Sequence, residues 1–328
     1  MPGATAVSTD DRPDAPWSRD PSKPLNVDPV AAVVDCGGIA STAELRSFGA
    51  GRRRLTELVA GGHLRRPRLG WYSTLPPDHP RYRAVRIGGR LTGLSALAEL
   101  GAWMLRAPER LEVAVARGSA RLRADRNAVV HWAADRTVPE SAAVVGCAEA
   151  LVRVTLDHDL ETSVPCIDWA FASGRLDRFS FEQFILALPA SARCIREWVD
   201  PRSQSVLESV ARVRLRRSGW SVRSQVRVGD LEAIDLVVGD VVALELDGRK
   251  HHEATFEADR RKDLSITIEG RHAIRVSYAM LVHDWRRIAL AIASAANARG
   301  HGPAQDSVTR LAEPRGSRYA TGAGRMTD

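Results

Sequence analysis

The sequence lacks long apolar runs, paired cysteines and, for the most part, lysine, and each shortage excludes a class of protein. Its 328 residues contain no run of eighteen consecutive apolar side chains, so we expect no membrane-spanning helix. The four cysteines stand apart without a Cys-x-x-Cys pair, which argues against a zinc ribbon or a disulfide framework and favours reduced thiols. The first residues carry neither the basic nor the apolar region of a signal peptide, so we expect a cytoplasmic protein.

Arginine supplies nearly all of the positive charge. Only Lys23, Lys250 and Lys262 are lysines, although the chain has a formal net charge of +7 and an isoelectric point of about 9.7. One interpretation is a genome whose codon usage favours arginine. The other is attraction to an anionic polymer such as nucleic acid, which basic proteins bind electrostatically. Clusters of arginine, rather than the total charge, have to decide between the two.

Changes in composition divide the chain into five segments. Residues 1–27 and 299–328 are polar, have no hydrophobic period and are predicted to be disordered. Between them we expect an N-terminal domain at residues 28–80, a linking α/β domain at 88–200 and a C-terminal domain at 203–298. The expected fold class is therefore a multidomain α+β or α/β protein.

Residues 29–75 have the pattern of three short helices followed by a basic hairpin. Ser41 with Glu44 three residues later is a capping box that starts the second helix. The third helix stops at Gly61, and residues 63–74 then alternate and turn like a small β-wing. This order predicts a winged helix-turn-helix, in which the last helix enters the major groove of DNA and the wing touches the backbone.

Two arginine clusters lie on the two elements that would face DNA. They are Arg52, Arg53 and Arg54 at the start of the third helix, and Arg65, Arg66 and Arg68 on the wing. A solvated basic face is the alternative interpretation.

This segment and the following "RLTGLSALAELGAWML" resemble the N-terminal domain of AbiEi-type antitoxins. In that family a helix opens on Ser-Ala, as at Ser95 and Ala96, although the histidine often found near the position of Gly101 is absent. The resemblance implies a DNA-binding transcriptional repressor and a partner toxin or other neighbouring-gene product.

Residues 90–200 contain no motif that predicts chemistry. The stretches "LEVAVARG" and "NAVVHWAA" predict strands, and "PCIDWAFASGRL" and "SFEQFILALPA" predict helices. Asp168, Trp169 and Glu182 are interpreted as core and surface residues. We expect this segment to orient the domains on either side of it.

From residue 203 onward the pattern predicts the order α-β-β-β-α-β-α, with acidic residues at the ends of two adjacent strands. Asp235 lies in one strand, and Glu245 and Asp247 end the next. Because side chains alternate along a strand, Glu245 and Asp247 share a face, where we expect them to project at the fraying end of the sheet.

Asp235 lies on the same face only if the loop between the two strands contains an odd number of residues. We therefore expect a three-residue loop at residues 238–240, or a bulge. Carboxylates gathered in this way suit Mg²⁺ or Mn²⁺, which polarises a scissile phosphate and activates the attacking water.

This order is that of the PD-(D/E)XK nuclease core, which has a restriction-endonuclease-like fold. Within it, "ESVARVRLRRSG", "IDLVV", "ELDGRKHH", "DRRKD" and "AIRVS" resemble the very-short-patch-repair (Vsr)-like endonuclease-domain family, in order and spacing, over residues 203–285. The resemblance implies DNA as substrate and Asp235 as the main metal ligand, with Glu245 or Asp247 as the second. The other roles it implies are assistance by Glu208, proton relay or water orientation by His251 or His252, and phosphate binding by Arg260 and Arg275. Asp247 stands where the wider superfamily has a lysine, and Lys250 is a candidate to supply that charge.

Each of these residues also has a structural interpretation. Ser205 and Glu208 form a second capping box, the histidines suit a surface, and Asp259, Arg260 and Asp263 suit salt bridges along a helix. Two functions therefore stay open. One is a Mg²⁺-dependent DNA endonuclease, and the other is a non-catalytic DNA-binding repressor that carries a degenerate nuclease fold.

Overall fold

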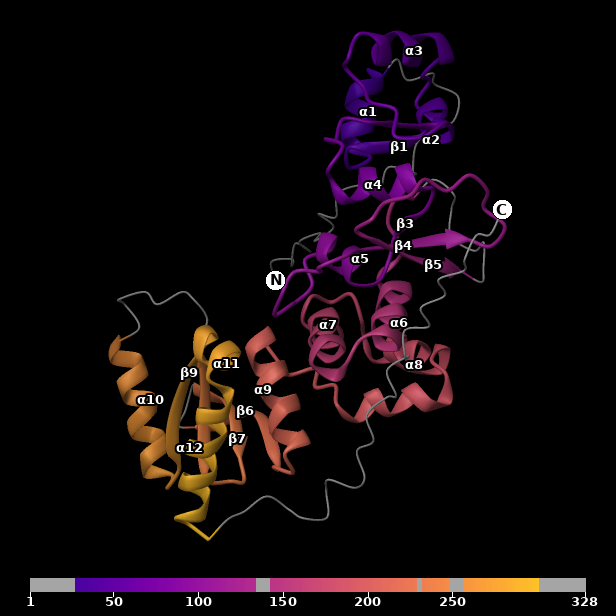
Figure 1. Ribbon diagram of the computed structural model, residues 1–328. Helices are drawn as coiled ribbons and strands as arrows, with labels where there is room; N and C mark the ends of the chain where they lie inside the picture. Colours follow the sequence, from indigo (N-terminus) through magenta and orange to yellow (C-terminus); the bar gives the residue numbers. More distant parts are fainter. Residues whose placement is uncertain (1–26, 134–141, 229–231, 248–255, 301–328) are drawn as a thin grey trace, which may run out of the picture. The chain divides into compact units, whose positions relative to one another are not determined.

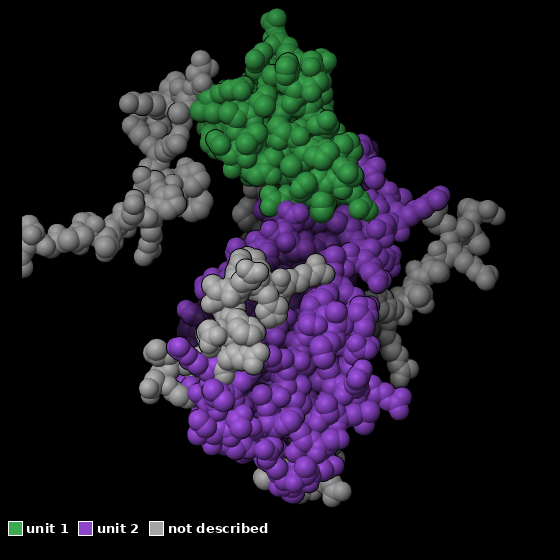
Figure 2. Space-filling model, turned by 90° about the vertical axis from the view of Figure 1, so that its left-hand side faces the viewer, with its two compact units in different colours: residues 1–85 green, residues 86–328 purple. Residues whose placement is uncertain are grey.

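The computed structural model describes residues 27–133, 142–228, 232–247 and 256–300. The chain forms two compact units, residues 1–85 and 86–328 (Figure 2). Helices and small β-sheets occur in both, so the mixed α+β class expected from the sequence is confirmed. Nearly all of the two tails expected to be disordered lies outside the described residues. In the part of the chain that the structure describes, no helix is both long and apolar enough to cross a bilayer.

Three helices and a short sheet make up the first unit (Figure 1). They are α1 (Pro29–Asp35), β1 (Ile39–Ser41), α2 (Thr42–Ser47), α3 (Arg52–Ala60) and β2 (Trp71–Ser73). The predicted capping box starts α2, because the Ser41 hydroxyl accepts the N–H of Glu44 at 3.2 Å and the Glu44 carboxylate accepts that of Ser41 at 2.7 Å. The N–H groups of Arg65 and Ser73 each donate to the other's carbonyl, which closes the predicted hairpin after α3.

The second unit begins with a three-stranded sheet and a group of helices. They are β3 (Arg90–Leu91), α5 (Gly93–Glu99), β4 (Leu111–Ala116), β5 (Ala128–Ala133), α6 (Cys147–Asp157), α7 (Leu160–Ala172), α8 (Arg178–Ala187) and the 3₁₀-helix η1 (Ala190–Glu197). Helix α4 (Pro80–Ile87) contains the division between the units. The strands and helices predicted for residues 90–200 are all present. Among the described residues, none of the four cysteines forms a disulfide.

The C-terminal part has the predicted order, with one extra short helix. It comprises α9 (Val206–Arg217), β6 (Val222–Val228), β7 (Glu232–Val238), β8 (Val242–Asp247), α10 (Phe256–Ile268), β9 (His272–Ser277), α11 (Tyr278–His283) and α12 (Trp285–Asn297). The sheet order is β6-β7-β8-β9, antiparallel except for the parallel pair β8 and β9. The parallel pair needs the crossover through α10, because parallel neighbours cannot be joined by a tight turn.

Helices cover both faces of this sheet. Leu244, Leu246 and Val276 point into a core shared with α9, α11 and α12. On the opposite face, Ala243 packs with Ile266 of α10. The alternation predicted for the second acidic strand is thus confirmed, with its leucines in the core and its acids on the face that α10 covers.

Helix α9 is buried more completely than its sequence predicts. The pattern predicts a single apolar stripe, yet Glu208, Ser209 and Arg212 are each at most 4% exposed. The reason is that α9 packs against the sheet on one side and against α7 on another. Its polar side therefore lies in an interface and not in water.

Candidate active site

The loop between β7 and β8 sets which side chains share a face of the sheet. Val238 pairs with Val242, which leaves a three-residue loop at residues 239–241. The expected three-residue loop is confirmed, one position later than predicted. Continued for one step past the last pair, this register sets Asp235 directly opposite Glu245.

The two carboxylates lie where the pairing of β7 with β8 stops. Asp235 is half-buried, and its Oδ2 accepts the main-chain N–H of Leu246 at 2.8 Å. Glu245 is only 5% exposed, because α10 covers its face of the sheet. The expectation that these acids project away from the packing at the fraying end of the sheet is therefore wrong for Glu245. The strand pairing does end there, but a helix covers the end.

A lysine from α10 reaches Glu245. The Nζ of Lys262 lies 2.5 Å from Glu245 Oε2, and the lysine side chain is 16% exposed. The other oxygen, Oε1, is buried and has no hydrogen-bond partner among the described residues. The amine beside Glu245 thus comes from α10 and not from the strand, where Asp247 stands. The candidate suggested by the sequence, Lys250, lies outside the described residues.

Burial dominates the ionisation of this cluster. It raises the pKa of Glu245 to about 7, against the lowering effect of the Lys262 hydrogen bond. Burial also raises the pKa of Asp235, although the Leu246 N–H and the charge of Lys262 lower it. For Glu208 burial again acts first, and the charge of Asp235 adds to the rise in its pKa. Asp235 therefore stands close enough to Glu245 and to Glu208 to oppose the ionisation of each, which a cation would relieve.

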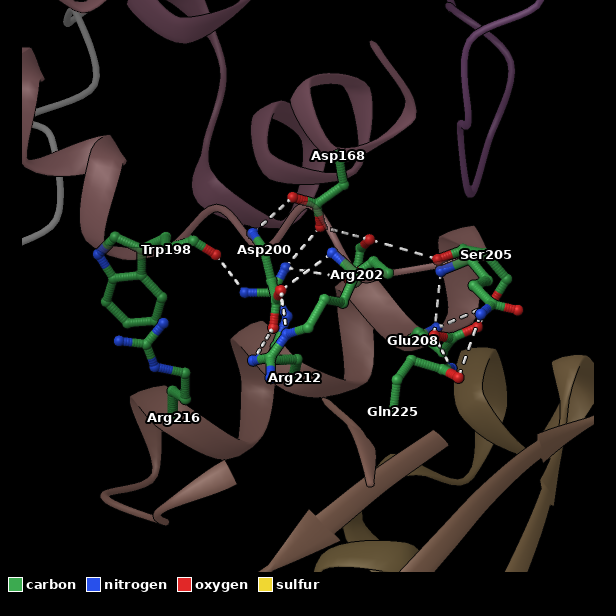
Figure 3. A network of polar contacts seen from close by, with 12 residues as sticks. Asp168, Trp198, Asp200, Arg202, Ser205, Glu208, Arg212, Arg216 and Gln225 are labelled. Carbon is green, nitrogen blue, oxygen red and sulfur yellow. Dashed lines mark hydrogen bonds and ion pairs between the residues drawn. The ribbon is translucent and has the colours of Figure 1, made fainter. Parts of the chain in front are cut away.

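Glu208 lies in the first turn of α9 and contacts both Ser205 and Gln225. Its N–H donates to the Ser205 hydroxyl at 3.2 Å, so Ser205 caps α9. Its Oε2 also accepts the side-chain amide of Gln225 at 2.9 Å (Figure 3), and the same amide nitrogen lies 3.4 Å from Asp235 Oδ1. Gln225 could not be predicted as a site residue, because a glutamine in an alternating edge strand gives no signal of its own.

The remaining predicted residues divide into those near the acids and those outside the described chain. Asp247 follows on the same strand face, and its charge contributes to the raised pKa of Asp235. Arg275 pairs in register with Glu245 across β8 and β9, and its Nη2 donates to Asp263 at 2.9 Å. His251, His252 and the side chain of Arg260 lie outside the described residues.

A buried ion pair connects α9 with α7. Arg212 Nη2 lies 2.5 Å from Asp168 Oδ2, and the two side chains are 2% and 0% exposed (Figure 3). The Asp168 carboxylate also accepts the Ser209 hydroxyl at 2.6 Å and the Asp200 N–H at 2.9 Å. The interpretation of Asp168 as a plain core residue is therefore incomplete. It is the counter-ion that allows the polar side of α9 to be buried.

In the first unit, the six predicted DNA-contacting arginines lie on α3 and on the hairpin. Arg52, Arg53 and Arg54 form the first turn of α3 and are exposed. Glu57 partly balances two of them, at 3.1 Å from Arg53 and 3.8 Å from Arg54. On the hairpin, Arg65 donates to the carbonyl of Thr74, Arg66 lies over the ring of Tyr72, and Arg68 is half-buried.

The acid cluster offers carboxylate oxygens, the ligands that a divalent cation such as Mg²⁺ prefers. Among the described residues no three His, Cys, Asp or Glu side chains converge as a complete ligand set. Mg²⁺ does not require one, because it keeps several waters and binds through one or two carboxylates. Asp235 and Glu245 offer two facing carboxylates, and the buried, unpartnered Oε1 of Glu245 is an oxygen that a cation would satisfy. The residues present therefore fit Mg²⁺ or Mn²⁺.

Comparisons with known proteins add little to this geometry. No family model matches the chain, and no curated protein matches it. Among solved structures, the chain is similar to the RV2827C protein from Mycobacterium tuberculosis, at 18% sequence identity and a TM-score of 0.28. The similarity covers 56% of this chain and 79% of the other. A likeness this weak carries no argument about fold or function.

The raised pKa of Glu245 should make the free energy of unfolding depend on pH. Because its pKa is 4.5 in its ordinary state and about 7 when folded, the stability that its protonated form contributes is fully present below pH 4.5 and is lost as the pH rises to about 7. The variant Glu245→Gln lacks this group. Its free energy of unfolding should rise relative to that of the unaltered protein across this window, by at most about 3 kcal/mol.

Urea unfolding at a series of pH values, with EDTA present, measures the difference between the two proteins. A difference that is the same at every pH would contradict the assignment of a raised pKa to Glu245.

Proposed function

We propose that this protein is a Mg²⁺- or Mn²⁺-dependent DNA endonuclease of the PD-(D/E)XK type. The observation that carries the proposal is the facing pair Asp235 and Glu245, with the Lys262 amine at 2.5 Å from Glu245. Two strand-end carboxylates and an amine are the groups that this class of phosphodiester hydrolysis uses. The Vsr-like pattern of the sequence over residues 203–285 supports the same proposal.

In this proposal the acids and the lysine have separate tasks. Asp235 and Glu245 would hold the cation, which when bound polarises the scissile phosphate and lowers the pKa of the attacking water. Lys262 donates to Oε2 of Glu245 and would keep a positive charge beside a bound phosphate, where negative charge builds up during hydrolysis. It would stand in for the strand lysine that Asp247 replaces. Glu208 and Arg275 border the site from α9 and β9.

We further propose that the first unit is a winged helix-turn-helix that binds DNA. Positive side chains at the N-terminus of a helix oppose its macrodipole and weaken it. Arg52, Arg53 and Arg54 nevertheless occupy the whole first turn of α3, and Arg53 is 95% exposed. Residues that break a local rule without a structural gain are typical of a functional surface. Glu57 is a single acid that faces both Arg53 and Arg54, and DNA phosphates would provide further anions for this cluster.

Incubation with supercoiled plasmid in Mg²⁺ or Mn²⁺ tests the nuclease. We expect nicked or linear DNA with the unaltered protein and none with a double variant, Asp235→Ala and Glu245→Ala. The thermal unfolding temperature of the variant has to be measured beside it, because removal of two buried acids alters stability. Cleavage that survives in a folded double variant would overturn the proposed site.

A second candidate function is a non-catalytic repressor of the AbiEi-antitoxin kind, with a partner toxin encoded nearby. The exposed arginines at the start of α3 favour it, since they would serve DNA binding with or without cleavage. A gel-shift assay on the same proteins separates the two. DNA that is shifted but never cut supports the repressor, provided that alanine at Arg52, Arg53 and Arg54 abolishes the shift.

A further inference from the structure

Gln225 has a backbone conformation that its residue type does not favour. It lies inside β6 with φ +52°, in the left-handed region that side chains other than glycine rarely adopt. Ser224 pairs with Leu236 and Val226 with Ile234, while position 225 between them is out of the ladder. Strain of this kind persists where the surrounding structure enforces it, and such places are often functional sites.

From this position the Gln225 side chain reaches two acids on different elements. Its Nε2 donates to Glu208 of α9 at 2.9 Å and lies 3.4 Å from Asp235 Oδ1 of β7. Its Oε1 accepts the side-chain amide of Gln204 at 3.2 Å, which fixes the orientation of the amide group. One neutral group thus connects the two carboxylates, as Figure 3 shows for its contact with Glu208.

An amide suits this position better than a negatively or positively charged side chain. A carboxylate would add a third negative charge between Glu208 and Asp235, whose charges already oppose one another. A lysine or arginine would neutralise the acids and compete with a cation. The amide offers two N–H donors and no charge, so it can hold both acids and leave their charge available.

We propose that Gln225 is a positioning residue that holds the Asp235 carboxylate in place by tying it to Glu208. The expected effect on DNA cleavage rests on the proposed function. The expected effect on the hydrogen bond between Asp235 and Leu246 does not depend on it. In this role Gln225 would act through Asp235 and would not itself bind the cation or the DNA. The Oδ2 of Asp235 accepts the N–H of Leu246. That hydrogen bond reports whether the carboxylate stays in its orientation.

The chain offers a matched pair of variants. Gln225→Gly relieves the left-handed backbone and removes the amide bridge. Asp240→Gly relieves the same kind of strain, at φ +63°, at an exposed position of the β7–β8 loop outside the acid cluster, and removes a solvent-exposed ion pair with Arg223. Both glycines suit their backbone, so both variants should unfold at or above the temperature of the unaltered protein. Any difference between them then reflects the bridge and not the fold.

Two measurements decide the proposal. In native-state hydrogen exchange, the Leu246 N–H should lose protection in Gln225→Gly and keep it in Asp240→Gly. In the plasmid assay, the initial rate should fall about tenfold to a hundredfold in Gln225→Gly alone, because a misplaced ligand costs rate without abolishing chemistry. Unchanged protection of Leu246 in folded Gln225→Gly would overturn the proposal. Failure of every protein to cleave would overturn the nuclease, while the exchange of Leu246 would still decide the role of Gln225.

Discussion

Replacing Arg212 with alanine is expected to lower the free energy of unfolding by about 3–5 kcal/mol, because it leaves a buried charge without a partner. Asp168 is 0% exposed and lies 2.5 Å from the Arg212 guanidinium. Arg212 also donates to the carbonyl of Trp198, which would lose its partner too. Urea unfolding followed by circular dichroism measures the loss.

A surface ion pair in the same unit provides the control. Arg196 binds both oxygens of Glu182, at 2.5 and 2.6 Å, but the two side chains are 43% and 45% exposed. Solvent screens such a pair, so Arg196→Ala should cost at most about 1 kcal/mol. If both arginine variants lose the same small amount, the Arg212–Asp168 pair does not hold α9 against α7. Replacing both members of the buried pair, with Asp168→Leu and Arg212→Met, should recover much of the loss, because an apolar pair removes the uncompensated charge.

The second large effect is expected at Lys262. Lys262→Met should reduce the rate of DNA cleavage by about 10²–10³-fold, which is typical of removing one charged donor from a phosphoryl-transfer site. The loss should fall on kcat more than on KM, because the charge is needed most when negative charge builds up on the phosphate. Lys262→Arg keeps the charge but changes the reach and shape of the donor, so it should restore the rate only in part. Initial rates over a range of DNA concentrations measure both constants.

Arg261 lies next to Lys262 on the same helix but is exposed, and it is the matched control. Arg261→Met removes the same charge from α10 and should change cleavage by less than about tenfold. Equal losses in the two variants would mean that α10 contributes only a general positive field. Lys262→Met leaves the buried Glu245 carboxylate without the Lys262 ammonium. The unfolding temperatures of the variants therefore have to be compared before their rates.

The local features of the fold followed from the sequence because they depend on near neighbours. Ser41 and Glu44 predicted a capping box three residues apart, and the structure contains both of its hydrogen bonds. Asp235 and Glu245 could share a face only if the loop between their strands had an odd number of residues, and the loop has three. Periodicity and capping are short-range properties, so a sequence states them directly.

What the sequence could not predict depends on contacts between distant residues. Lys262 reaches Glu245 only because α10 crosses over the sheet. Gln225 matters because its backbone leaves the strand conformation, which no alternation pattern records. Asp168 was interpreted as inert because its cation, Arg212, comes 44 residues later on a helix whose pattern predicted an exposed polar side. In each case the decisive partner is supplied by tertiary packing.

The burial of Arg212 also limits which segments of this chain can be recombined with other proteins during evolution. A recombination event that cut at residue 203, where the sequence suggests a boundary, would transfer α9 and its sheet without Asp168. The transferred segment would carry the buried guanidinium of Arg212. The protein that received it would have to supply a carboxylate at the position of Asp168. Helix α7 and the four-stranded sheet are therefore expected to be inherited together. A segment that looks like a spacer in the sequence is, in this protein, part of what keeps the C-terminal domain intact.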